Sequence, residues 1–212
     1  MQQITKEQLT SLENVARASA TSAQDALSKL IDIPVRLEMM RTRVMEVERL
    51  TYILAAPQES VSAVLLPITG EGNMGSSVLI SSLEESHHLA ELVMKRPKGS
   101  LTKLDALMTS AIMETANIIG GAFLSVLSDT TGISLVQSVP TIATMQEVVD
   151  ATVTKLHEGT SKSSVAFEID FGLKITTTTT TTTTEEIITH YVFLLEVAFA
   201  KKLLKALEKS ST

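Results

Sequence analysis

The spacing of apolar residues predicts a chain in which helices and strands are mixed. From Lys6 to about Ile31, apolar side chains recur every three or four residues, as on the buried face of a helix. The longest predicted helix runs from Leu101 to about Ser128. Shorter helical patterns cover residues 83–95, 144–157 and 198–209.

Strands are predicted between these helices, where runs of Val, Ile, Leu and Phe lose the helical spacing. They cover residues 31–47, 59–70, 75–82, 131–140, 163–175 and 185–197. Pro34 prevents the first helix from continuing, and Pro140 closes the strand that follows the longest helix.

The chain divides into two similar halves. In each half a helix that carries Leu-Ser-x-Leu near its end leads through a short turn into a strand, in residues 25–37 and 123–136. No long polar linker separates the halves. We therefore expect one α+β domain over residues 1–212, with a diverged internal repeat whose halves are about 6–99 and 100–208.

Composition narrows the class of protein. Hydrophobic residues make up 44% of the chain but aromatic residues only 3%, which predicts an aliphatic core. The net charge of −6 argues against a general nucleic-acid binder, because such proteins need a basic surface for phosphates. The chain has no Cys, which suits a reducing compartment. It shows neither a signal peptide nor an obvious membrane-spanning run. We expect a soluble cytoplasmic protein without membrane insertion.

Two patterns that resemble ligand sites are better explained by structure alone. Gly70–Gly75 reads GEGNMG, but a strand pattern follows it where dinucleotide binding requires a helix, so a hairpin turn is expected. His87 and His88 are adjacent and would point about 100° apart on a helix. His88 and Glu91 could approach one ion, but no third ligand is evident. His157 and His190 are isolated in the sequence, so a catalytic triad has no support. We predict no metal site.

Nine consecutive threonines, Thr176–Thr184, form the one low-complexity segment. Threonine favours extended backbone, but a run without alternation specifies no register between strands. An extended hairpin or a loop is the expected structure, and no chemistry is assigned to the run.

A polar stripe crosses the longest predicted helix. At 100° per residue, Ser110, Glu114, Asn117 and Gly121 fall within about 60° of one another. Apolar residues fill the flanking face, so the helix is amphipathic with a narrow polar edge. A carboxylate can pair with a partner's lysine, and a carboxamide can both donate and accept hydrogen bonds. Helix geometry alone leaves open whether this edge docks a partner or simply faces solvent.

The spacing beyond the helix adds a resemblance to a known family. Ser110, Glu114, Asn117 and Pro140 fit the pattern (Asp/Ser)-x3-Glu-x2-Asn-x22-Pro. In this the chain resembles the chemotaxis phosphatases CheC, CheX and FliY, over roughly residues 6–207. Its length and repeat favour CheC. The resemblance implies an α+β fold with a pseudo-two-fold repeat and long helices packed on an antiparallel sheet.

By the same resemblance, the chain removes the phosphoryl group from the aspartyl phosphate of the response regulator CheY. Glu114 and Asn117 would be its catalytic residues, with Ser110, Pro140 and Gly121 shaping the site. The resemblance also implies that this chain binds no cofactor or metal ion. The Mg²⁺ ion is expected on CheY. The implied state is a monomer that binds phosphorylated CheY, with the deamidase CheD as a further candidate partner.

The first helix departs from the CheC pattern, which usually repeats Glu-x-x-Asn there. Aligned on the helix end, Asn14 stands at the Glu position and Arg17 at the Asn position, so the first site is expected to be inactive. An adaptor that regulates CheD is the main alternative. A FliY-like switch component is a second one, disfavoured because little sequence follows Ala206. An unrelated domain with a coincidental motif is a third.

Overall fold

A computed structural model describes residues 4–46, 61–70, 72–103, 105–143, 147–148, 164–178 and 182–210. The described helices are α1 (Lys6–Ile31), α3 (Leu83–Val93), α4 (Ala106–Thr131) and α6 (Val197–Ser210). The strands are β1 (Val35–Glu46), β2 (Val61–Gly70), β3 (Gly72–Ser82), β4 (Leu135–Gln137), β5 (Thr141–Ala143), β6 (Ser164–Thr178) and β7 (Thr182–Glu196).

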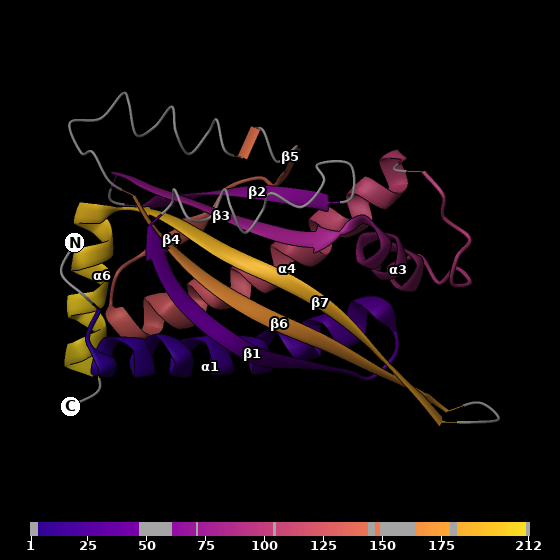
Figure 1. Ribbon diagram of the computed structural model, residues 1–212, viewed down its shortest axis with the longest axis horizontal. Coiled ribbons are helices and arrows are strands. Elements are labelled where there is room, and N and C mark those ends of the chain that lie inside the picture. Colours follow the sequence, from indigo (N-terminus) through magenta and orange to yellow (C-terminus); the bar gives the residue numbers. More distant parts are fainter. Residues whose placement is uncertain are drawn as a thin grey trace.

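The strands form one antiparallel sheet in the order β1-β6-β7-β3-β2-β4, with β5 also paired to β2. The helices α1, α4 and α6 pack together and share the main apolar core with this sheet. Both chain termini lie at the α6 end, and β6 and β7 project at the opposite end (Figure 1). The α+β class and the antiparallel sheet under long helices are thereby confirmed.

The two faces of the sheet follow from the alternation of side chains along its strands. On β6, Phe167, Ile169 and Phe171 belong to the core shared with the helices. On the opposite face, Ala166 belongs to a smaller apolar cluster, and Glu168 is buried as well. On β6 the outer face therefore carries buried polar groups, whereas the inner face is apolar.

The two long helices are built alike. Each contains 26 residues, and they begin at positions 6 and 106. Asp32 and Gly132 end them in the left-handed conformation, with φ of 62° and 69°. The hydroxyl of Ser28 accepts the backbone N–H of the first β1 residue, and that of Ser128 accepts the N–H of the first β4 residue. Residues 100 apart thus occupy equivalent places, which gives the internal repeat its register.

Several predicted boundaries are confirmed and others need correction. The first helix begins and ends where the sequence predicted, because Thr5 and Gln8 form a capping box at its start and Asp32 ends it in the left-handed conformation. Helix α4 begins at Ala106 instead of the predicted Leu101, because the Asp105 side chain accepts the Met108 N–H and caps the helix there. The predicted helix 144–157 lies almost wholly outside the described residues.

Both hairpin interpretations agree with the structure. The segment predicted as a glycine-rich turn lies in the β2–β3 hairpin, but most of it is strand, because Gly70 ends β2 and Gly72 begins β3 opposite it. The threonine run extends the β6–β7 hairpin, with Thr176 opposite Thr184 and Thr178 opposite Thr182. Residues 179–181 lie outside the described part of the chain.

Helix α4 is long and apolar enough to cross a membrane by length and composition, with a mean hydropathy of 1.4 in its most apolar window. No obvious membrane-spanning run was expected from the sequence, so this apolar length of α4 is a correction. In the structure, α4 packs against α1, α3 and the sheet, and ten of its residues are buried. Its apolar character is therefore that of a core helix.

Candidate functional site

An aromatic cluster fixes α4 against the sheet. Phe123 on α4 lies with its ring centroid 4.5 Å from that of Phe193 and 5.7 Å from that of Tyr191, both on β7. The Tyr191 hydroxyl is fully buried and donates to Ser77 Oγ at 2.8 Å. Truncation of such a buried Phe generally costs about 3–5 kcal/mol. The core is thus not purely aliphatic, contrary to the prediction from composition. These ring contacts join α4 to β7.

The polar stripe of α4 lies on its exposed side. Ser110, Glu114, Asn117 and Gly121 are all exposed, whereas the residues between them are mostly buried. Leu107, one turn before Ser110, continues the stripe and is 56% exposed. The structure therefore presents the predicted site residues of α4 on one accessible edge.

Asn117 is held by a residue that sequence reasoning did not identify. Gln137, at the end of β4, donates from Nε2 to Asn117 Oδ1 at 2.7 Å and to the Asn117 carbonyl oxygen at 3.4 Å. β4 is fixed beside the helix by its pairing with β2, in which Ile68 stands opposite Gln137. Pro140 follows three residues later, immediately before β5. The motif's proline therefore closes the segment that carries this anchoring glutamine.

The two adjacent glycines have different surroundings. A Cβ on Gly121 would have no heavy atom within 4 Å, so this position is open to an approaching molecule. A Cβ on Gly120 would lie 2.0 Å from Gln137 Oε1 and 2.9 Å from the Tyr191 hydroxyl oxygen. The glycine that the fold itself requires is Gly120, because its missing side chain leaves the space that Gln137 occupies.

The equivalent edge of α1 carries different chemistry. Thr10, Asn14 and Arg17 occupy the places of Ser110, Glu114 and Asn117, and all three are exposed. Arg17 forms an ion pair with Glu13 at 3.7 Å. The alignment made from the sequence thus agrees with the helix ends, and α1 lacks the Glu and Asn pair of α4.

The histidines on α3 do not form a metal site with Glu91. His88 Nε2 lies 2.8 Å from Glu185 Oε2, beside a cavity of about 370 Å³. Glu91 is turned to the following loop, where it accepts the backbone N–H groups of Gly99 and Leu101 at 2.9 and 2.8 Å. Although burial opposes ionisation, these hydrogen bonds lower the pKa of Glu91. Its carboxylate is therefore a structural anchor for the loop before α4.

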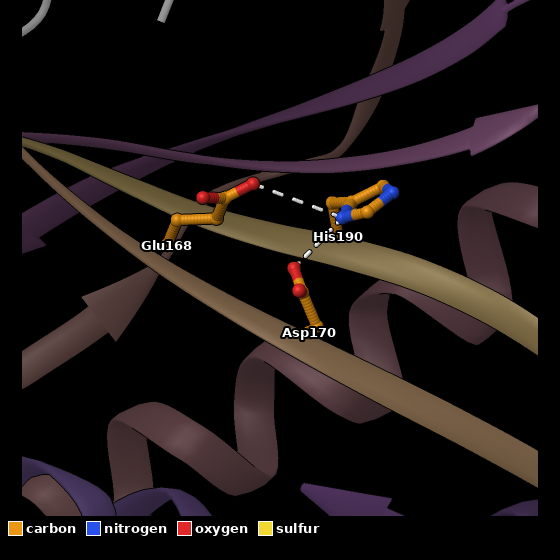
Figure 2. A group of neighbouring side chains, drawn as sticks. All are labelled: Glu168, Asp170 and His190. Carbon is orange, nitrogen blue, oxygen red and sulfur yellow. Dashed lines mark hydrogen bonds and ion pairs between the residues drawn. The ribbon is translucent and has the colours of Figure 1, made fainter. Parts of the chain in front are cut away.

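His190 is not isolated, contrary to the sequence-based interpretation. Figure 2 shows it beside Glu168 and Asp170 on the outer face of the sheet, and its Nδ1 lies 2.8 Å from Asp170 Oδ1. Both carboxylates also bind arginines: Arg41 Nε is 2.8 Å from Asp170 Oδ2, and Arg43 Nε is 2.6 Å from Glu168 Oε2. The carboxylate oxygens are thus engaged by cationic side chains, and these residues form an ion-pair network.

The charges of this network shift the ionisation of its members. The hydrogen bond with Asp170 raises the pKa of His190, against the effect of burial. Burial opposes ionisation of Asp170, but its bonds with His190 and Arg41 outweigh this and lower the pKa of Asp170. The network is therefore most stable with the carboxylate ionised and the imidazole protonated.

Comparisons with known proteins give a consistent set of relatives. No protein-family model matches the chain. The CheY-P phosphatase CheC of Bacillus subtilis (strain 168) is 23% identical over 142 residues, which cover 66% of this chain and 68% of the relative. The structure of Thermotoga maritima FliY matches with a TM-score of 0.74 at 18% identity, covering 99% of this chain and 100% of that chain. The middle domain of FliM from H. pylori matches with a TM-score of 0.66 at 11% identity, covering 96% and 99%.

Proposed function

We propose that this chain, which is similar in sequence to the phosphatase CheC and in fold to FliY, is a phosphatase for a CheY-type response regulator. Its substrate is the aspartyl phosphate of that regulator, and its products are the free aspartate and inorganic phosphate. The observation that carries the proposal is the exposed edge of α4, on which Glu114 and Asn117 stand three residues apart.

Asn117 is proposed to orient the attacking water. Its carboxamide is exposed and is held from behind by Gln137, so it can enter a partner's site without first losing rotamer freedom. The transition state of phosphoryl transfer is loose, so catalysis depends on alignment and charge more than on covalent chemistry. A single positioned carboxamide suits that requirement.

Glu114 is proposed to pair with a lysine of the regulator's active site. In the described part of the chain, no hydrogen bond or ion pair engages the exposed Glu114 carboxylate. Ser110 would line the same edge, and Gly121 leaves room for the regulator's backbone. The Mg²⁺ ion that supports the chemistry is proposed to sit on the regulator. Leu107 adds an apolar contact at the end of the stripe.

Phosphate release from phosphorylated CheY in the presence of Mg²⁺ tests the proposal. Wild-type protein should accelerate release, and Asn117→Ala should reduce this acceleration by about 10²-fold, the usual effect of losing one positioned polar group. Asn14→Ala is the matched control, because Asn14 is an exposed asparagine on the equivalent edge of α1. It should leave the rate unchanged.

Two outcomes would contradict the proposal. If Asn117→Ala releases phosphate as fast as wild type, the assigned site is wrong. If wild-type protein does not accelerate release, the phosphatase function itself is wrong, and binding to the deamidase CheD becomes the function to test by pull-down.

A further inference from the structure

We propose that Gln137 is a positioning residue that fixes the orientation of the Asn117 carboxamide. The inference rests on the proposed function, in which Asn117 orients the attacking water. Gln137 itself does not contact the water or the phosphoryl group. It acts through the hydrogen bond from its Nε2 to Asn117 Oδ1.

The contact fixes one of two orientations of the Asn117 amide. Because Gln137 Nε2 is a donor, the Asn117 atom facing it must be the acceptor Oδ1. The Asn117 Nδ2 group is then directed away from Gln137, and Oδ1 keeps one further lone pair. The second contact, from Gln137 Nε2 to the Asn117 carbonyl oxygen, ties the same amide to the α4 backbone. Side-chain rotation at Asn117 is thereby opposed at two points.

Gln137 is itself held in a place made for it. Its backbone is paired with Ile68 of β2, and its Oε1 occupies the space left by the missing side chain of Gly120. That Oε1 is buried and has no hydrogen-bond partner among the described residues. A buried acceptor without a partner normally costs stability. The donor end of the same side chain reaches Asn117, so the favourable contact of Gln137 is made at Nε2.

The first half of the chain offers a comparison. Gln24 on α1 also links its helix to the following strand, but there Oε1 accepts the backbone N–H of Leu37 at 3.3 Å. The place equivalent to Gln137 is Leu37, and the place equivalent to Gly120 is Ala20. The half without the Glu and Asn pair therefore also lacks the glutamine and the glycine that hold the asparagine.

The first measurement is independent of activity. The chain contains only Asn14, Asn73 and Asn117, so the side-chain amide of Asn117 can be assigned in the ¹H–¹⁵N spectrum by its loss in Asn117→Ala. In Gln137→Leu, this resonance should move toward the shift and mobility of a free amide, while that of Asn14 stays in place. Gln24→Leu, the same chemical change in the first half, should leave the Asn117 amide unaffected.

The second variant is Gln137→Glu, which keeps the size of the side chain but cannot donate to Oδ1. The Asn117 amide should reverse, so that Nδ2 faces the introduced carboxylate, and its resonances should shift strongly. This variant keeps the proposal testable if Gln137→Leu does not fold.

The third measurement is the rate of CheY dephosphorylation. Both Gln137 variants should lower kcat by about 10-fold to 10²-fold, as expected when a reacting group is misplaced without being lost. The KM for phosphorylated CheY should stay within about twofold, because Gln137 lies behind the docking edge. An Asn117 amide that is unchanged in both variants, or a kcat that is unchanged while the amide is freed, would overturn this inference. Absence of activity in wild type would overturn the proposed function and, with it, the role of Gln137 in positioning Asn117 for catalysis.

Discussion

The adjacent glycines of α4 allow a stability test in which the helix stays the same and only the surroundings differ. In a helix interior, replacing Gly by Ala gains about 0.8–1.0 kcal/mol of stability. For Gly121→Ala this gain should appear in full, because no heavy atom lies within 4 Å of the added Cβ. Gly121→Ala is therefore expected to stabilise the protein by about 1 kcal/mol.

Gly120→Ala starts from the same gain but adds a clash. The new Cβ would lie 2.0 Å from Gln137 Oε1 and 2.9 Å from the Tyr191 hydroxyl oxygen. Tyr191 is fully buried and cannot retreat, so Gln137 must move and release Asn117. Overpacking of this kind generally costs about 1–3 kcal/mol. Gly120→Ala should therefore be less stable than Gly121→Ala by about 1–3 kcal/mol.

The measurement is urea unfolding followed by far-UV circular dichroism, with the midpoints compared at equal slopes. A Gly120→Ala, Gln137→Ala double variant should recover part of the loss, because the shorter side chain vacates the contested space. The reasoning fails if Gly120→Ala and Gly121→Ala unfold at the same urea concentration.

Two further predictions concern ionisable side chains outside the site, the half-buried His190 and the buried Glu91. Because the folded pKa of His190 is raised, its stabilising contribution is complete below the unfolded value of 6.5 and is lost as the pH rises through the folded value. Wild type should therefore lose stability relative to His190→Gln as the pH rises above 6.5, and parallel pH profiles from urea unfolding would contradict this. Glu91→Gln should cost about 1.5–3 kcal/mol at neutral pH, because the loop's N–H groups lose a charged acceptor. Since the pKa of Glu91 is lowered, that difference should shrink as the pH falls through it, and equal urea midpoints at pH 7 would refute the assignment.

Periodicity was sufficient to predict the long helices and the exposed edge. The bounds of α1 followed from its apolar spacing, and rotation by 100° per residue placed Ser110, Glu114 and Asn117 on one edge. The start of α4 was placed too early because Leu101 continues the apolar spacing, although Asp105 caps the helix. Local capping overrides periodicity at such a boundary.

The contacts that hold the site could not be predicted in this way. The hydrogen bond between Gln137 and Asn117 depends on the register of β4 against β2, which no local pattern specifies. Gly120 and Gly121 look alike in sequence, and only the packing of Gln137 tells them apart. By contrast, the outer-face ion pairs could have been anticipated from the sequence. Glu168 and Asp170 are two residues apart on a predicted strand, so their side chains lie on the same face of the sheet.

Because residues 100 apart occupy equivalent places in the two halves, the α4 motif can be copied onto α1 of the same chain. Changing Asn14 to Glu and Arg17 to Asn would copy the motif onto α1 in an equivalent backbone. The copy would still lack its support, because Ala20 stands in the place of Gly120 and Leu37 in the place of Gln137. Activity of the copied site would show that the Glu and Asn pair is sufficient for catalysis. Its inactivity would show that the supporting glycine and glutamine are also required.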